Sequence, residues 1–236
     1  MIICNRNRRT TMTENYIECI ALTRQFRGKN KTLTAVGNIN LGIRQNDLVL
    51  IKGRSGAGKS TLLNLMCGLI KPTHGRVMID NDCISELADD SLSRLLSDKI
   101  GIIFQSFNLL PTYTVFENIE IALIPKGVAR SLIRENIFTL LDQFNLKDKA
   151  DLMPSELSAG QQQKVAIIRT LVKQPSIIFA DEPTGSVDEE TAQEILDHLL
   201  YLKKEKKVTL VIATHGNVPD IFADKVFIIE NGRIKG

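Results

Sequence analysis

Short runs of consecutive apolar residues recur along the chain, and segments with helical periodicity stand between them. Such runs are typical of strands buried on both faces of a parallel sheet, because neither face then carries polar side chains. The strands predicted from these runs span 48–51, 100–104, 176–182 and 208–214. Strands that alternate with helices in this way predict an α/β fold.

A second group of strands is predicted by alternation of apolar and polar residues instead of continuous apolar runs. Tyr16–Leu22 and Ile39–Ile43 favour two strands of an antiparallel layer, and the turn residues at 28–31 separate them. Further turns and strands are predicted from the same signals at 72–75, 76–80, 225–230 and 231–232.

Apolar residues spaced three and four apart predict the helices. One helix covers Leu62–Ile70, and another covers Thr191–Lys204 with His198 facing solvent. From 106 to 157 the chain shows helical spacing interrupted by prolines, without strand-like alternation. We therefore expect a helical lobe at about residues 106–172, inserted into the sheet domain.

The segment after the first buried strand matches the phosphate-binding pattern G-x-x-x-x-G-K-[ST] at every fixed position. A strand precedes it and a helix follows it, which is the context that the pattern requires. Glycines let backbone N–H groups turn towards a triphosphate, and a helix start favours an anion. Lys59 is then expected to reach the β- and γ-phosphates, and Ser60 to bind Mg²⁺. The loop comprises Gly53, Arg54, Ser55, Gly56, Ala57, Gly58, Lys59, Ser60 and Thr61.

Polar residues at the ends of the other buried strands are candidates for the same site, since α/β sheets bind ligands at their strand ends. Gln105 follows the second strand, where it can contact a γ-phosphate and Mg²⁺. Asp181 and Glu182 end the third strand; the first is expected to face Mg²⁺ and the second to orient the attacking water. His215 follows the fourth strand and is the best placed of the three histidines for a γ-phosphate contact.

Two further features each have two interpretations. Phe26 lies just past the first alternating strand, where it can stack on a nucleotide base or pack in the core. Ser158, with Gln161 three residues later, forms a capping-box pattern at the start of a helix. This pattern serves ordinary helix capping, and it also leaves N–H groups that can meet an anion.

The net charge of +3 does not indicate a nucleic-acid partner. Residues 1–13 contain Arg6, Arg8 and Arg9 and no acid, and we expect this segment to be a flexible basic extension. Without these three, the 30 basic residues become 27, which equals the 27 acidic residues. No basic face is therefore expected, and no binding to nucleic acid.

Length and composition bound the remaining possibilities. The 236 residues, 43% of them hydrophobic, suffice for one core with a small attached lobe. No apolar run approaches the length of a membrane span or of a signal peptide core, so we expect a cytoplasmic chain. The four cysteines lack the spacing of a metal site, and we assign them no role.

Taken together, these motifs resemble those of the ATP-binding subunits of ABC (ATP-binding cassette) transporters, over about Tyr16–Lys235. GRSGAGKST resembles Walker A, IIFADE resembles Walker B, Gln105 the Q-loop glutamine and His215 the switch histidine. Phe26 occupies the place of the adenine-stacking aromatic. The family signature is matched by Leu157, Ser158, Ala159, Gly160 and Gln161, and the D-loop by Gly185, Ser186, Val187 and Asp188.

The resemblance implies a P-loop NTPase (RecA-like) sheet core in residues 14–236, with an antiparallel β layer and an inserted helical lobe. It implies that two copies hydrolyse ATP with Mg²⁺ between them, the signature of each acting on the ATP bound by the other. It also implies a partner, a transmembrane permease, that holds the chain at the cytoplasmic face of the membrane. The catalytic residues would be Lys59, Gln105, Glu182 and His215, and the Mg²⁺ ligands Ser60, Gln105 and Asp181.

Within the family, the segments FQSFNLLP and ADEPTG are most similar to those of one subgroup. This subgroup drives macrolide exporters, lipoprotein-release complexes and related mechanotransmission complexes. An ABC importer is the alternative. A DNA-maintenance ATPase of this type would need a long heptad insertion or a basic face, and a small-molecule kinase would leave the signature helix unexplained.

Four residues depart from the family pattern. Arg54 stands where the loop usually has proline, Ala159 where the signature has glycine, and Val187 where the D-loop has a leucine-like residue. These three changes keep the backbone donors and the key side chains, so ATP hydrolysis is still expected. Gly216 follows His215 where the family often has an acid, which affects how the histidine is held.

Overall fold

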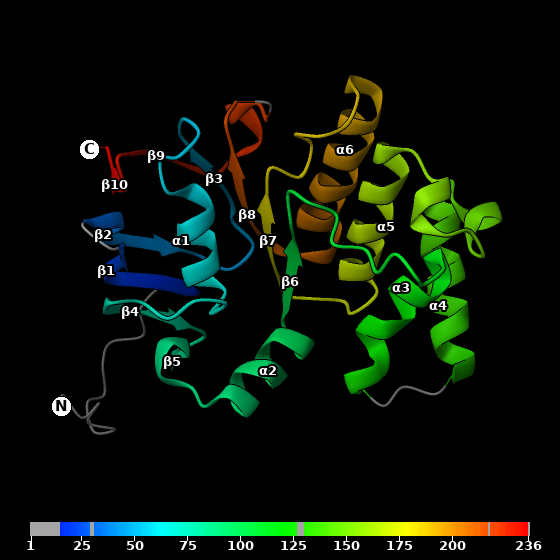
Figure 1. The fold of residues 1–236 in the computed structure, drawn as a ribbon, viewed down its shortest axis with the longest axis horizontal. Coiled ribbons are helices and arrows are strands. Elements are labelled where there is room, and N and C mark those ends of the chain that lie inside the picture. The colour runs from blue at the N-terminus through cyan, green and yellow to red at the C-terminus, as the bar shows by residue number, and fades with distance from the viewer. Residues whose placement is uncertain (1–14, 29–30, 127–129, 217, 236) are drawn as a thin grey trace.

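The computed structural model describes residues 15–28, 31–126, 130–216 and 218–235 (Figure 1). The predicted basic extension at 1–13 lies outside these residues, as do the two central residues of the turn predicted at 28–31. A six-stranded and a four-stranded sheet form the centre of the molecule, and helices flank the larger sheet.

The larger sheet has the strand order β10-β9-β3-β8-β7-β6 and is parallel except for the hairpin formed by β9 and β10. Its inner strands are almost wholly buried, which explains their continuous apolar sequence. All four strands predicted from apolar runs are present. The strands are β3 (Leu48–Lys52), β6 (Ile100–Ile103), β7 (Ile177–Asp181), β8 (Thr209–Thr214), β9 (Lys225–Glu230) and β10 (Arg233–Ile234).

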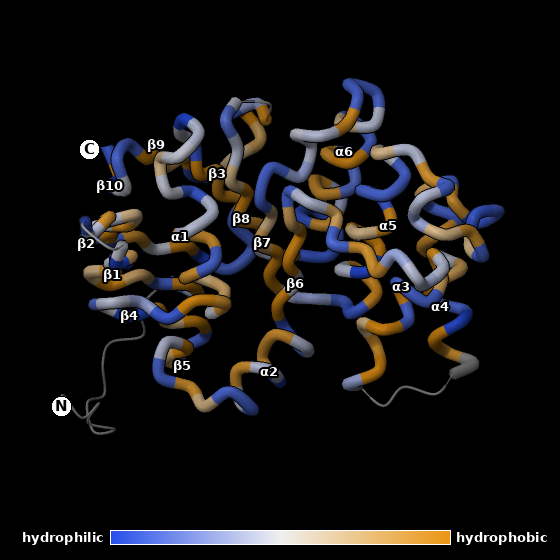
Figure 2. Tube along the Cα trace, in the orientation of Figure 1, coloured by the Kyte–Doolittle hydropathy of each residue, from blue (hydrophilic) through white to orange (hydrophobic). Residues whose placement is uncertain are grey.

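Alternate residues of these strands enter two hydrophobic cores, one on each face of the sheet. On β3, Leu48 and Leu50 pack with the helical lobe, whereas Val49 and Ile51 pack with α1 (Lys59–Met66) and the smaller sheet. Figure 2 shows the hydrophobic colour concentrated along the central strands and the hydrophilic colour on the surrounding loops. The phosphate loop and the signature helix therefore lie on opposite sides of one sheet.

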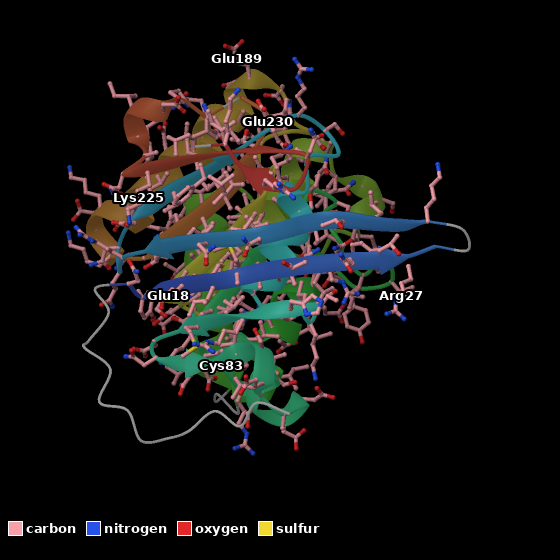
Figure 3. All side chains as sticks on the ribbon, turned by 90° about the vertical axis from the view of Figure 1, so that its left-hand side faces the viewer. Glu18, Arg27, Cys83, Glu189, Lys225 and Glu230 are labelled. Carbon is pink, nitrogen blue, oxygen red and sulfur yellow. The ribbon has the colours of Figure 1, made fainter. Side chains whose placement is uncertain are left out.

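The smaller sheet is antiparallel, in the order β2-β1-β4-β5, and its long strands β1 and β2 lie side by side in Figure 3. The antiparallel layer was predicted correctly, but both predicted strands are shorter than the strands in the structure. β1 continues past Phe26, so the face of this sheet reaches the nucleotide site. The strands are β1 (Ile17–Arg27), β2 (Thr32–Ile43), β4 (His74–Ile79) and β5 (Asp82–Cys83).

The helical lobe predicted after Gln105 is present, and its helices pack on the face of the sheet opposite α1. None of the helices in the described part of the chain combines the length and the apolar character needed to cross a bilayer. The helices of this side are α3 (Val115–Glu120), α4 (Arg130–Gln143), α5 (Ala159–Leu171) and α6 (Glu189–Lys206). Short 3₁₀ turns lie at Ile84–Glu86, Ile121–Lys126, Lys147–Lys149, Pro154–Glu156 and Asp220–Phe222.

Two features of the fold differ from the expectations. The sequence analysis predicted no helix at α2 (Asp89–Asp98), which has no buried residue and connects the smaller sheet to β6. The prediction that His198 faces solvent was wrong. Its ring is half-buried and stacks on Phe144 of the helical lobe, with centroids 3.9 Å apart. Burial lowers the pKa of His198 below its ordinary value, so the ring is neutral at pH 7.

Candidate functional site

The phosphate loop runs from the end of β3 into α1, and its conformation depends on glycine. Gly58 caps α1 with a left-handed backbone (φ 104°), and a Cβ there would lie 2.3 Å from the carbonyl oxygen of Ala35. Gly56 is also left-handed (φ 76°), but a Cβ there would meet no atom within 4 Å. The loop thus packs closely on its outer side, against β2, and leaves open space beside Gly56 for a ligand.

The ammonium group of Lys59 lies against the loop. Its Nζ donates hydrogen bonds to the carbonyl oxygens of Gly53 (2.9 Å) and Arg54 (3.3 Å), and it lies 3.4 Å from Oε1 of Glu182. Lys59 is only 7% exposed, so its charge is little screened by water. A phosphate entering the loop would meet a cation that the protein already holds in position.

A cavity of about 770 Å³ opens beside the loop, and its volume suits a nucleotide-sized ligand. It brings together residues from six separate parts of the sequence. Phe26 and Leu33 lie on its wall with the phosphate loop, and so do Gln105, Glu182 and His215. The remaining lining residues are Thr34, Ala35, Ser55, Gly56, Gly58, Lys59, Ser60, Thr61, Asn231 and Gly232.

Glu182 lies in this cavity between two nitrogen-bearing side chains. Its Oε1 faces Lys59, and its Oε2 lies 2.6 Å from Nδ1 of His215. The backbone N–H of Glu182 donates to the carbonyl oxygen of Ala213, which fixes the residue beside β8. The carboxylate is buried, whereas the His215 side chain is 53% exposed and faces the open cavity. This arrangement holds a carboxylate where a water molecule can approach it.

The residues predicted to bind Mg²⁺ provide oxygen atoms that suit this ion. Oδ1 of Asp181 is buried and has no hydrogen-bond partner within the described part of the chain. Burial raises the pKa of Asp181 above its ordinary value, and the nearby hydroxyl of Ser60 opposes that rise. Mg²⁺ prefers one or two carboxylate or hydroxyl ligands together with water and phosphate oxygens. The unpaired oxygen of Asp181, the Ser60 hydroxyl and the exposed Gln105 beside the cavity fit that preference.

Phe26 lies on the cavity wall with its side chain 40% exposed, which excludes the core-packing alternative. The guanidinium of Arg24 covers the ring, with its central carbon 4.8 Å from the ring centroid. Leu33, which pairs with Phe26 across β1 and β2, lines the same cavity. An aromatic ring supported in this way can stack on a base, and this role remains a prediction.

The signature residues form the start of α5. Ser158 Oγ accepts from the N–H of Gln161, and the Gln161 side chain accepts from the N–H of Ser158. This confirms the capping box. Residues 157–161 are not among the described residues that line the cavity. The signature of the chain therefore does not lie at the phosphate loop of the same chain.

The D-loop residues lie between β7 and α6. Ser186 is exposed, and Asp188 is the N-cap of α6, where it accepts from the N–H of Thr191 at 2.8 Å. That bond lowers the pKa of Asp188. A Cβ added to Gly160 would lie 3.0 Å from Oγ1 of Thr191, so the starts of α5 and α6 are in contact.

Several residues of the site were not predicted from the sequence. The turn Asn231–Gly232 packs against the phosphate loop, and the N–H of Gly232 donates to the carbonyl oxygen of Ala57 at 2.9 Å. Thr34 and Ala35 line the cavity from the start of β2. These residues come from distant parts of the chain and carry no local motif, so only the fold reveals them.

Residues 36–185 match the model of the protein family described as ABC transporter. The chain is 39% identical over 210 residues to the ABC transporter ATP-binding protein YtrE of Bacillus subtilis, spanning 89% of this chain and 91% of that protein. It is 39% identical over 219 residues to the methionine import ATP-binding protein MetN of Staphylococcus saprophyticus, spanning 92% of this chain and 64% of that protein.

Solved structures of ABC proteins share the fold. The ATP-binding cassette MJ0796, a dimer in a post-hydrolysis state bound to ADP and Pi, matches with a TM-score of 0.88 and 37% identity. The match covers 93% of this chain and 97% of that chain. CbiO1 from Clostridium perfringens, part of the ABC transporter complex cbiONQ, matches with a TM-score of 0.81 and 28% identity, over 95% of this chain and 88% of that chain.

Proposed function

The chain belongs to the ABC transporter family of ATP-binding proteins, and from this we propose that Mg-ATP bound between two copies closes a dimer and drives a separate membrane permease. The chain is an ATPase with a P-loop NTPase fold. The single observation that carries the proposal is the cavity in which Lys59, Glu182 and His215 meet beside the phosphate loop.

In this proposal the triphosphate of ATP lies along the phosphate loop, with the base against Phe26. Lys59 binds the β- and γ-phosphates from the position that it already holds. Mg²⁺, when bound by Ser60, Asp181 and Gln105, supplies positive charge beside the phosphate oxygens.

Glu182 is the general base in this scheme. Its carboxylate accepts the proton of the attacking water, and His215, 2.6 Å away, orients the carboxylate and contacts the γ-phosphate. When a phosphate binds Lys59, the ammonium group pairs with the phosphate instead of with Glu182. Oε1 of Glu182 is then free to accept a hydrogen bond from water. The contact between Lys59 and Glu182 thus supports a base that ATP binding itself exposes.

The second half of each site comes from the other copy. The capped start of α5 presents N–H groups at an exposed surface away from the cavity of its own chain. Two copies related by a two-fold axis would form two equivalent sites from these surfaces. The dimeric state of MJ0796 supports this arrangement for a chain of the same fold.

The permease is proposed to work in export, extraction or mechanotransmission, which rests on the subgroup motifs, and to hold the chain at the cytoplasmic face of the membrane. The similarity to a methionine import ATP-binding protein favours an importer as the second candidate. The membership of CbiO1 in a transporter complex supports a partner of this kind in either case.

The decisive variant is Glu182→Gln, which keeps the shape of the side chain and removes the base. We expect ATP binding to persist and phosphate release to fall by about 10²–10⁴-fold. Glu205→Gln is a matched control, because Glu205 is an exposed carboxylate near the end of α6 and is not among the described residues that line the cavity. Hydrolysis by Glu182→Gln at the rate of the parent protein would show that Glu182 is not the base.

A further inference from the structure

Gln163 is a buried polar residue on α5, two residues beyond the signature. Its side chain is only 2% exposed, and its Nε2 donates a 2.7 Å hydrogen bond to the carbonyl oxygen of Pro183. A carbonyl oxygen can only accept, so the orientation of the amide is defined. The bond therefore links the signature helix to the residue that directly follows Glu182.

The turn that receives this bond has an unusual backbone. Glu182 has a left-handed conformation (φ 46°), which residues other than glycine rarely adopt. The N–H of Gly185 donates to the Glu182 carbonyl oxygen at 3.0 Å and closes the turn. Such a conformation persists only where neighbouring contacts hold it, and Gln163 holds the next peptide along the chain.

Gln163 also retains an unpaired polar atom. Its Oε1 is buried and has no hydrogen-bond partner in the described part of the chain. Burying an unpaired amide oxygen is unfavourable, and an apolar side chain of the same size would avoid that cost. Packing alone therefore does not explain a glutamine here, whereas the donated hydrogen bond does.

The contacts beside Gln163 place the whole face of α5 against the D-loop side of the site. Gly160 packs on Thr191 at the start of α6, and Lys164 forms an ion pair with Glu194 on the same helix. Residues three and four apart lie on one face of a helix, so 160, 163 and 164 form one surface. That surface begins one turn from the Ser158 cap.

We propose that Gln163 is a positioning residue that holds the Glu182–Pro183 turn and links the signature end of α5 to the catalytic carboxylate of the same chain. This inference rests on the proposed role of Glu182 as the base. The signature acts on the ATP of the partner copy, and Glu182 acts on the ATP of its own chain. The Gln163 amide thus connects the helix that carries the signature, which serves one site of the dimer, to the turn that carries Glu182, which serves the other site.

The first test is Gln163→Met, which preserves the length of the side chain and removes the donor. We expect the variant to fold, because removal of the unpaired buried oxygen offsets the loss of the donor to the Pro183 carbonyl. Its kcat falls by about 10- to 100-fold, while KM for ATP stays within about twofold because the phosphate loop is intact. The control is Gln193→Met, which removes an exposed hydrogen bond to Asp197 on α6. A kcat within about twofold of the parent protein would overturn the proposal.

The second test is the pH profile of Gln163→Glu. Burial raises the pKa of the introduced carboxyl, and only its protonated form can donate to the Pro183 carbonyl. Its kcat relative to the parent protein therefore falls as pH rises, whereas Gln163→Met is low at every pH. A purely structural effect would lower the melting temperature without this profile, and a flat ratio would contradict the inference.

Glu182→Gln, measured alongside, separates the two proposals. If it is slow while Gln163→Met matches the parent protein, only the role of Gln163 is wrong. If Glu182→Gln hydrolyses ATP at the parent rate, the proposed base is wrong, and the inference about Gln163 fails with it.

Discussion

Asn118, on α3, holds the segment that follows Gln105, and its replacement should loosen that segment. The side chain is fully buried. Its Oδ1 accepts from the N–H of Leu110 (2.7 Å), and its Nδ2 lies within hydrogen-bond distance of three carbonyl oxygens. These belong to Leu110, Tyr113 and Thr114, and the two hydrogens of the amide are shared among them. One side chain thus bonds to the backbone at three positions between Leu110 and the start of α3.

The cost of Asn118→Leu can be derived from these bonds. The carbonyls of Leu110 and Thr114 each keep a backbone donor, from Tyr113 N–H (3.2 Å) and Asn118 N–H (2.9 Å). The Leu110 N–H and the Tyr113 carbonyl lose the partner that Asn118 gives them. Because Leu110 and Tyr113 are exposed residues, water can partly replace that partner; at about 0.5–1.5 kcal/mol net for each of the two groups, we expect a loss of about 1–3 kcal/mol.

The assay is urea denaturation together with hydrogen exchange of the amides in 105–114. The free energy of unfolding should fall by the stated amount, and the Leu110 amide should exchange much faster than in the parent protein. Asn136→Leu is a control, since Asn136 is exposed on α4. A loss below about 0.5 kcal/mol with the Leu110 amide still protected would refute the reasoning, because the hydrogen bonds of Asn118 would then contribute little.

Three further predictions concern the site and the lobe. Mixing Lys59→Ala with Ser158→Arg, each inactive alone, should restore single-turnover phosphate release to about a quarter of the parent sites, because half of randomly paired dimers contain one intact composite site. No recovery in proven heterodimers would contradict composite sites. Phe26→Leu should raise KM for ATP about 5- to 100-fold through lost base stacking, with tripolyphosphate binding unchanged as the control. The free energy of unfolding should fall as the pH is lowered below about 6.5, because His198 binds a proton more readily in the unfolded chain than in the folded one. Denaturation of His198→Phe over the same pH range should show a smaller fall.

The sign of the last prediction follows from the lowered pKa. A histidine that the fold keeps neutral contributes its full stability above the ordinary pKa of 6.5. As pH falls below that value, the unfolded chain binds a proton that the folded chain does not, so unfolding becomes easier. A stability that rises on acidification through this range, relative to His198→Phe, would contradict the packing of His198 on Phe144.

The central sheet and the phosphate loop could be predicted from the sequence because their signals are local. Continuous apolar runs mark strands buried on both faces, and the loop pattern fixes glycine where the backbone is left-handed, as at Gly58. The strand ends at Gln105, Glu182 and His215 were predicted to meet because parallel strands end at one edge, and all three line the cavity.

The features that the sequence did not predict depend on contacts between distant segments. α2 is the exception: its apolar residues Leu92, Leu95 and Leu96 stand three and four apart and could have indicated the helix, although none of them is fully buried. His198 stands among apolar residues of α6, and its ring is stacked by Phe144, which directly follows α4. The bonds of Gln163 and Asn118 go to backbone carbonyls, which carry no sequence signature.

Side chains of helix α5 donate hydrogen bonds to backbone carbonyl oxygens on both sides of the site. Near its start, Gln163 holds Pro183; further along, Arg169 donates to the carbonyl oxygens of Phe107 (2.9 Å) and Asn108 (2.6 Å), just after Gln105. Thr170 donates to the carbonyl oxygen of Ile102 on β6, the edge strand of the sheet, so α5 also bonds to this edge. Because a helix of this length is stiff, a displacement of the loop after Gln105 must either break these bonds or move the signature end of α5 with it.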